Sequence, residues 1–191
     1  MKKRIKEILC QREKQHIMAT NAPLAPAAVL LPLYHKDNEY HILLTKRTEK
    51  VAYHKRQICF PGGARHPEDR SLADTAVRET LEEIGIRPQD VEILGELDDI
   101  GTVTSKFLIT PFVALIPYPY EFVVNSDEIE ELIEVPIPAL LHRGCHREEF
   151  YAHQGKHCWV CIYQLGDKVI WGATASILKQ FLDLVFGDNQ G

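Results

Sequence analysis

Three glutamates crowd the segment "RETLEEIG" at residues 78–85, and a glycine follows them. On an α-helix, residues at i, i+3 and i+4 share one face, so Glu79, Glu82 and Glu83 would form one stripe of carboxylates. Like charges at this spacing destabilise a helix by a few tenths of a kcal/mol. Hard cations such as Mg²⁺ and Mn²⁺ prefer oxygen ligands and would remove that penalty. The stripe is therefore a candidate divalent metal site on a helix, with an ordinary solvent-exposed helix face as the alternative.

The residues around this stripe predict where its helix begins and ends. Apolar residues recur near a 3.6-residue period across 71–84. Ser71 is suited to cap the N-terminus, with Asp74 three residues later, and Gly85 is suited to end the helix. Upstream, "FPGG" predicts a tight turn in which Gly63 lets a ligand approach its backbone carbonyl.

Arg78 is the cation closest in sequence to the stripe. It lies one helical turn before Glu82, which predicts an i,i+4 ion pair. It can instead reach back and hold the preceding loop through Asp69 or Glu68. Both alternatives place a positive charge beside the carboxylates.

The rest of the chain predicts a mixed α/β sandwich with one helix in the middle. A hairpin is expected around "HKDNE", where Asp37 and Asn38 supply turn chemistry, and a short strand "QICF" is expected to stop at "PGG". Segment 126–141 predicts a short helix or loop that leads to a strand and a turn. The other expected elements are strands within 91–103, 107–117 and 148–172, with turns at Gln154–Gly155 and Gly166–Asp167, and an amphipathic helix over 173–186.

Composition limits the class of protein. The chain has 191 residues, and its 45% hydrophobic and 26% charged residues are typical of a globular protein. A formal net charge of −5 gives no support for nucleic-acid binding. No run approaches the roughly 18 apolar residues of a membrane span, and the basic N-terminus, a short amphipathic helix with Ile5, Ile8 and Leu9, lacks a signal-peptide core. Five cysteines, an odd number, fit a reducing compartment, so we expect a cytoplasmic protein.

A stretch rich in histidine and cysteine at 142–161 is a second candidate metal site. Zinc uses such ligands, but a single C-x-x-C without a second well-spaced pair is a weak signal. The pair also lies in an apolar, strand-like run, where residues three apart point to opposite faces. The pattern therefore disfavours a structural zinc site. The candidate ligands are His142, Cys145, His146, His153, His157, Cys158 and Cys161.

The longer stretch "PGGARHPEDRSLADTAVRETLEEIGI" resembles the Nudix box, usually written G-x5-E-x7-R-E-U-x-E-E-x-G-U with U aliphatic. Thr80 stands where an aliphatic residue is usual. The interval from Gly63 to Arg78 is one residue longer than in the box. Counting forward from Gly63 puts Asp69 at the first acidic site, and counting back from Arg78 puts Arg70 there. The matching residues are Gly63, Arg78, Glu79, Glu82, Glu83, Gly85 and Ile86.

The segment before the box narrows the resemblance. "LLTKRTEKVAYHKRQICFPGG" is similar to the lead-in of the coenzyme A pyrophosphatase branch of the Nudix hydrolases, and the longer loop with Asp69 looks like that branch. Arg56 stands where that branch usually has glycine. The likeness covers about Ala25–Leu182 and implies a helical extension at 1–24 and a Nudix hydrolase domain at 25–191. The implied fold is α/β (α+β), a Nudix-type α/β/α sandwich with a mixed central sheet and the glutamate-bearing helix after the Gly-Gly loop.

The resemblance implies a metal-dependent enzyme that cleaves the pyrophosphate of coenzyme A or its derivatives. The products would be 3′,5′-ADP and 4′-phosphopantetheine or its acyl form. Mg²⁺ or Mn²⁺ would neutralise phosphoryl charge and help to make hydroxide from water. Glu79 and Glu83 are the implied direct ligands, Glu82 is a ligand or the group that orients water, Gly63 can add its carbonyl, and Arg78 completes the catalytic box.

Two further sets of residues follow from the resemblance. The family often adds one carboxylate after the box as a ligand or general base, and Glu128 is our choice among the acidic residues of 127–131. Cationic side chains suit the 3′-phosphate of coenzyme A, so Arg47, His54 and Arg56 are the expected substrate-binding residues.

Two alternatives stay open. The chain can be a Nudix hydrolase of another nucleoside diphosphate derivative, such as ADP-ribose, NADH or a dinucleoside polyphosphate. It can also be a non-catalytic Nudix-fold nucleotide-binding module, although such a module is expected to lose the box carboxylates that this chain keeps. All three hypotheses imply a small-molecule nucleotide partner, a monomer or homodimer, and neither nucleic acid nor membrane as a partner.

Overall fold

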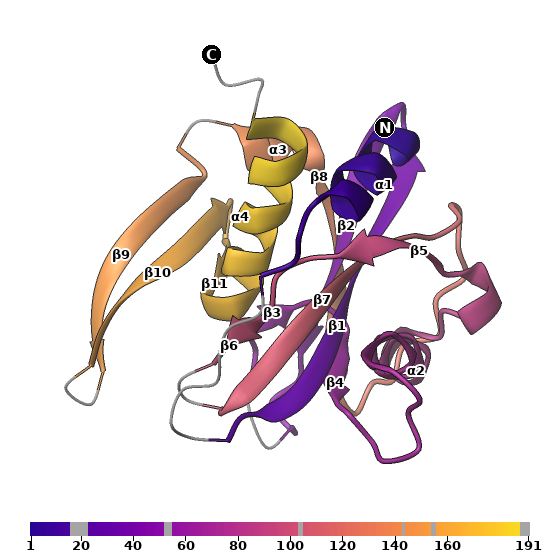
Figure 1. Ribbon diagram of the computed structural model, residues 1–191, viewed down its shortest axis with the longest axis horizontal. Helices are drawn as coiled ribbons and strands as arrows, with labels where there is room; N and C mark the ends of the chain where they lie inside the picture. The colour runs from indigo at the N-terminus through magenta and orange to yellow at the C-terminus, as the bar shows by residue number, and fades with distance from the viewer. Residues whose placement is uncertain (16–22, 52–54, 103–104, 143, 154–155, 188–191) are drawn as a thin grey trace.

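The computed structural model describes residues 1–15, 23–51, 55–102, 105–142, 144–153 and 156–187, with the side chains of 151–158 outside that description. Figure 1 shows a central sheet with helices packed around it and a β9–β10 ribbon that extends to one side. The elements in chain order are α1 (Lys2–Gln11), β1 (Ala25–Lys36), β2 (Glu39–Arg47), β3 (Ile58–Cys59), β4 (Gly62–Ala64), α2 (Leu72–Ile84), η1 (Pro88–Asp90), β5 (Glu92–Glu96), β6 (Ile100–Gly101), β7 (Phe107–Leu115), β8 (Ile129–Pro136), α3 (Ile137–Leu141), β9 (His146–His153), β10 (Lys156–Leu165), β11 (Lys168–Trp171) and α4 (Gly172–Phe186).

The central sheet is mixed, and β1 lies in its middle. The strand order is β3-β2-β1-β7-β5, while β4 pairs with β1, β6 with β7 and β8 with β2. β1 pairs antiparallel with β2 and parallel with β7, from Ala25 opposite Phe107 to Leu33 opposite Leu115. A parallel pair needs a long crossover, and the connection from β1 to β7 carries α2. The predicted mixed sheet is therefore confirmed.

Alternate side chains of β1 face two different helical layers. Ala28 and Leu30 pack with Ala76 of α2, whereas Leu31 and Leu33 belong to the main core with residues of α1 and α4. All four of these β1 side chains are fully buried. Each buried leucine contributes about 1.5–3 kcal/mol of transfer free energy, so both layers are firmly attached to the sheet. The predicted α/β/α sandwich is confirmed.

The capping of α2 matches its prediction. The Ser71 hydroxyl accepts a hydrogen bond from the Asp74 amide at 3.1 Å, and Gly85 adopts φ +75° and donates its amide to the Leu81 carbonyl at 2.9 Å. The helix packs on β1 and β4. This packing sets the carboxylate stripe of α2 beside the glycine-rich segment of β4.

The short strand predicted to stop at "PGG" is present as β3, but the two glycines expected in a tight turn lie in a further strand. Residues Gly62–Ala64 form β4 and pair antiparallel with β1, with Gly62 opposite Val29. Gly62 has φ +149°, and a Cβ added there would lie 2.3 Å from the Ala28 carbonyl oxygen. Glycine at position 62 therefore permits the close approach of the β4 and β1 backbones. The "PGG" motif alone does not indicate that pairing.

Two of the predicted turns are present. Asp37 and Asn38 join β1 to β2 with φ of 50° and 66°, and Gly166–Asp167 joins β10 to β11. The predicted turn at Gln154–Gly155 lies outside the described residues. Segment 126–141 forms a loop and the strand β8 as predicted, but the helix α3 replaces the expected final turn. Proline in the first turn of α3 suits a helix start, which explains the difference.

The remaining elements complete the core around the sheet. The predicted N-terminal helix is present as α1, and its Ile5 and Leu9 lie in the main core. β9, β10 and β11 form a second, antiparallel sheet on which α4 packs. The division between 1–24 and 25–191 stays a prediction. Among the described residues, no helix combines the length and apolar character needed to cross a membrane.

Candidate active site

Glu79, Glu82 and Glu83 form the carboxylate cluster of α2, and Glu83 is its most buried member, with only 2% of its side chain exposed. One carboxylate oxygen accepts the Gly62 amide at 3.2 Å, and the other accepts Arg47 Nη1 at 3.2 Å. Burial raises the pKa of Glu83 from 4.5 to about 7, against the opposing effect of the Arg47 charge. The ionised form is therefore costly unless a further cation binds.

Glu79 lies one turn earlier and contacts the second glycine of β4. Its side chain is 16% exposed, and burial raises its pKa while the Arg78 charge opposes that shift. A Cβ at Gly63 would lie 2.6 Å from the Glu79 carboxyl carbon and 2.7–2.8 Å from its oxygens. Each glycine of β4 thus contacts one glutamate of α2. Gly62 donates its amide to Glu83, and the missing side chain of Gly63 leaves space for the Glu79 carboxylate.

Arg78 realises both alternatives that the sequence left open. Nε and Nη2 donate to the two carboxylate oxygens of Asp69 at 2.9 and 3.0 Å, while Nη1 donates to Glu79 at 2.8 Å and to Glu82 at 3.2 Å. The guanidinium holds the pKa of Asp69 well below its usual range. Asp69 also accepts the Thr75 hydroxyl at 2.8 Å, a partner that the sequence did not identify. Arg78 therefore ties the loop before α2 to the carboxylate stripe.

Glu128 and Arg47 meet at the other side of Glu83. Arg47 Nη2 lies 3.8 Å from a Glu128 carboxylate oxygen, and Glu128 is 43% exposed. Asn125, another residue that the sequence did not identify, donates its amide to the Glu83 carbonyl at 2.9 Å and its side-chain Nδ2 to Glu128 at 3.3 Å. Its Oδ1 also accepts the Asp127 amide at 3.2 Å. Asparagine often forms this side-chain-to-backbone hydrogen bond in turns, and that preference is the sequence signal that could have identified Asn125.

The other acidic candidates after the box bind lysines instead. At distances of 2.7–2.9 Å, the pairs are Asp127 with Lys50, Glu130 with Lys46, and Glu131 with Lys168. Glu128 is therefore the one of these four carboxylates that lies beside Arg47, the partner of Glu83, within the part of the chain that the structure describes.

Arg56 lies at the edge of the site and not among the carboxylates. Its side chain is 64% exposed and Nε lies 3.2 Å from Glu49. Its φ of +59° is a left-handed conformation that favours glycine, the residue expected at this position. The arginine therefore keeps the glycine-type turn. His54 lies outside the described residues.

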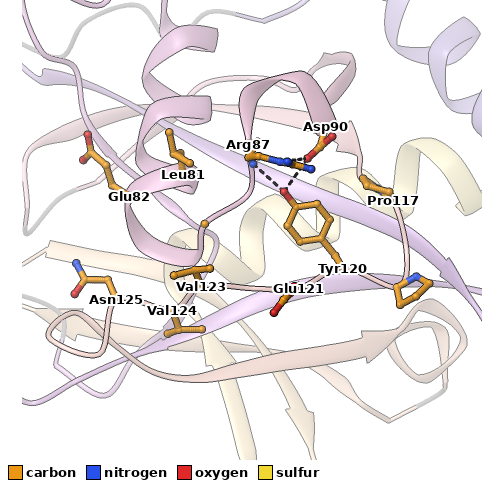
Figure 2. A pocket seen from close by; sticks show the side chains of 12 residues that line it. Leu81, Glu82, Arg87, Asp90, Pro117, Tyr120, Glu121, Val123, Val124 and Asn125 are labelled. Carbon is orange, nitrogen blue, oxygen red and sulfur yellow. Dashed lines mark hydrogen bonds and ion pairs between the residues drawn. The ribbon is translucent and has the colours of Figure 1, made fainter.

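Glu82 connects the carboxylate cluster to a pocket of about 760 Å³. Figure 2 shows Glu82 and Asn125 at one end of the pocket, while Arg87, Asp90 and Tyr120 are linked at the other. Tyr120 donates its hydroxyl to Asp90 at 2.9 Å and accepts the Arg87 amide at 3.0 Å. The pocket therefore has a fixed polar end and opens directly beside a carboxylate of the stripe.

The donor set has the chemistry of a hard divalent-cation site, but its three carboxylates are not all within 4.8 Å of one another and must converge to share one ion. Glu79, Glu82 and Glu83 supply carboxylate oxygens, and Gly63 supplies backbone without a side chain in the way. The buried Glu83, whose ionised form lacks sufficient compensation, is the observation that most favours a bound cation. Carboxylate oxygen without nitrogen or sulfur suits Mg²⁺ or Mn²⁺.

Gly63→Ala is expected to weaken Mn²⁺ binding by about tenfold or more, because the new Cβ displaces the Glu79 carboxylate. Mn²⁺ titration followed by electron paramagnetic resonance measures this affinity. Gly187→Ala is the matched control, since a Cβ there meets no atom of the described residues within 4 Å. Equal Mn²⁺ affinity in Gly63→Ala and wild type would show that the close approach of Gly63 to Glu79 is not part of a metal site.

Comparison with known proteins identifies relatives along most of the chain. A family model described as NUDIX domain matches residues 23–154. The chain is 35% identical over 159 residues to an uncharacterized Nudix hydrolase, NudL of Photorhabdus laumondii, covering 83% of this chain and 84% of that protein. It is 34% identical over 156 residues to the Escherichia coli protein of the same description, covering 81% and 79%.

Solved structures share the fold at lower identity. A MutT/nudix family protein from Enterococcus faecalis superposes with a TM-score of 0.57 at 16% identity, covering 91% of this chain and 66% of that one. A C. elegans Ap4A hydrolase in a binary complex superposes with a TM-score of 0.51 at 18% identity, covering 62% and 84%. At these identities the likeness concerns the fold alone.

Proposed function

This chain belongs to the Nudix hydrolase family, and on that premise we propose that it hydrolyses the pyrophosphate of coenzyme A or its derivatives. The products are 3′,5′-ADP and 4′-phosphopantetheine or its acyl form. The observation that carries the proposal is that two separate sequence signatures meet at one carboxylate. Arg47 of "LLTKR" and Gly62 of "FPGG" both donate to Glu83 of the box. The lead-in similar to the coenzyme A branch thus builds the same site as the box.

The chain's own side chains prepare the site for Mg²⁺ or Mn²⁺. Glu79 and Glu83 would hold the ion directly, Glu82 would hold it or orient water, and Gly63 can add its carbonyl. When bound, the ion neutralises charge on the phosphoryl oxygens and lowers the pKa of water. Arg78 fixes the orientation of Glu79 and Glu82 through two hydrogen bonds, at 2.8 and 3.2 Å.

Glu128 is the proposed general base. It is exposed enough to meet water, lies beside the Arg47–Glu83 pair and is oriented by Asn125. Glu128→Gln is therefore expected to lower kcat by about 10²–10⁴-fold at neutral pH, the range for losing a general base. Glu130→Gln is the matched control, because Glu130 pairs with Lys46. Equal kcat values for the two variants would remove Glu128 from this role.

The substrate beyond its pyrophosphate has two candidate environments. The pocket beside Glu82 is lined by Leu81, Val123 and Val124, which suits an uncharged portion such as the pantetheine arm. Arg47, Arg56 and His54 are proposed to contact the phosphates. For Arg56 the informative variant is Arg56→Gly, since glycine accepts φ +59° without strain, and a raised KM for coenzyme A with unchanged kcat is expected.

Mass analysis of the products tests the proposed reaction. Coenzyme A incubated with the enzyme and Mg²⁺ or Mn²⁺ should yield 3′,5′-ADP and 4′-phosphopantetheine. Glu83→Gln, purified in the same way, controls for contaminating hydrolases. Coenzyme A that stays intact under conditions where another nucleotide is cleaved would overturn the substrate assignment while leaving the Nudix chemistry in place.

A second candidate function is hydrolysis of another nucleoside diphosphate derivative, such as ADP-ribose, NADH or a dinucleoside polyphosphate. One observation favours it: Arg47 is already paired with Glu83 and Glu128, and Arg56 with Glu49. The proposed phosphate contacts must therefore compete with existing carboxylate partners. A non-catalytic module is disfavoured because all three stripe glutamates are present.

A further inference from the structure

Three metal-binding residue types meet on the β9–β10 ribbon, away from the carboxylate cluster. His146 and Glu148 are two residues apart on β9, so their side chains lie on the same face. Cys161 of β10 pairs directly with Glu148, and Tyr163 pairs with His146. Residues opposite one another in an antiparallel pair share a face, which brings His146, Glu148 and Cys161 together.

The donor atoms are close enough for one ion. One ligand atom from each of His146, Glu148 and Cys161 lies within 4.8 Å of the other two, and Cys161 Sγ is 3.9 Å from Glu148 Oε1. Ligands that bind tetrahedral zinc at about 2.0–2.3 Å lie roughly 3.3–3.8 Å apart, so the Cys161–Glu148 separation nearly fits and any wider pair must close by up to about 1.5 Å.

His146 supplies an independent observation. Its Nε2 is buried and has no hydrogen-bond partner in the part of the chain that the structure describes. The ring packs against Tyr163 with centroids 4.9 Å apart, which fixes its orientation without satisfying the nitrogen. A buried polar nitrogen without a partner is unfavourable, and a metal ion bound through Nε2 would satisfy it.

We propose that His146, Glu148 and Cys161 bind one Zn²⁺ ion, with the Cys161 thiol proton released to solvent. Nitrogen and sulfur ligands favour zinc over the hard cations of the oxygen-only site. The sequence disfavoured a zinc site in this segment because the two cysteines of the C-x-x-C motif were expected on opposite faces of a strand. The proposed site uses Cys161 of that pair with two residues from the neighbouring strand, and the side chain of Cys158 lies outside the described residues.

The surrounding groups are compatible with this assignment. Cys145 is excluded as a ligand because it is buried and donates its thiol to the Leu140 carbonyl at 2.9 Å. The Ser176 side chain of α4 lies within hydrogen-bonding reach of the Cys161 sulfur. Lys179 also lies near Cys161, and its ammonium group is paired with Asp183 at 2.6 Å.

Cobalt titration of the full chain tests the proposal, because a cobalt–thiolate bond gives a near-ultraviolet charge-transfer band that carboxylate ligands do not give. We expect the wild-type protein to develop this band at one Co²⁺ per chain and to lose it when Zn²⁺ is added. Cys161→Ser should abolish the band. Cys10→Ser, which alters an exposed cysteine, and Glu83→Gln, which alters the other metal site, should both keep it.

A second, milder substitution keeps the test informative if Cys161→Ser fails to fold. Glu148 is exposed, and Glu148→Gln is expected to weaken Zn²⁺ affinity by about tenfold or more without unfolding the protein. Absence of the band in wild type, persistence of the band in a folded Cys161→Ser, or unchanged Zn²⁺ affinity in Glu148→Gln would each overturn the proposal.

Discussion

Glu83→Gln is expected to lower kcat for pyrophosphate hydrolysis on the order of 10³-fold, which corresponds to several kcal/mol of lost transition-state charge stabilisation. Glu83 accepts hydrogen bonds from the Arg47 guanidinium and the Gly62 amide, and its side chain is almost fully buried. A neutral amide of the same size keeps the shape of the site but removes the negative charge that a divalent ion needs. Steady-state kinetics at saturating Mg²⁺ measure the effect.

The same substitution is expected to leave the fold intact. The folded-state pKa of Glu83, about 7, lies above its ordinary 4.5, so ionisation costs stability as pH rises from 4.5 through 7. Glutamine removes that cost at pH 8. In EDTA at pH 8, the Tm of Glu83→Gln should therefore equal or exceed the wild-type Tm. Near-normal kcat in this variant would remove the glutamate helix from the mechanism.

Arg78→Lys is expected to lower both kcat and Tm. Arg78 makes five hydrogen bonds from one planar group, to Asp69 twice, to Glu79, to Glu82 and to the Ala64 carbonyl. A lysine ammonium is a compact point donor and cannot reach these acceptors together. Displacing the carboxylates by about 1 Å is expected to reduce kcat about 10²-fold.

Arg87→Lys is the matched control for Arg78→Lys. Arg87 also donates Nε to an aspartate, Asp90, at 2.8 Å, but its side chain is 63% exposed. Exposed pairs contribute little, so this control should change Tm by no more than about 1–2 °C. Similar Tm values for the two variants, or a wild-type kcat in Arg78→Lys, would show that Arg78 does not organise the site. Thermal unfolding and kinetics of the same preparations make the comparison.

Local chemistry made α2 predictable from the sequence. Its N-cap at Ser71, its end at Gly85 and its carboxylate stripe all depend on residues close in sequence. The pairing of β4 with β1 was not predictable, because it depends on which distant backbone the glycines approach. Gly62 meets Val29 and Ala28 only after the chain has folded.

The choice among the acidic residues after the box likewise depends on contacts between residues far apart in the sequence. Asp127, Glu128 and Glu130 are nearly equivalent in sequence, and the resemblance alone suggested a single carboxylate. Their partners lie on β2 and the loop after it, so strand register decides which carboxylate contacts Arg47. The positive φ of Arg56 likewise depends on the turn in which it lies. The sequence showed only that arginine stands where the coenzyme A branch usually has glycine.

A competition assay tests the central proposal most directly. Equal concentrations of coenzyme A, ADP-ribose, NADH and diadenosine polyphosphates are incubated together with the enzyme and Mg²⁺ or Mn²⁺, and each is followed by mass analysis, so that relative consumption gives the ratio of kcat/KM values. We predict that coenzyme A is consumed first and yields 3′,5′-ADP. Faster consumption of ADP-ribose or of a dinucleotide would contradict the assignment to coenzyme A.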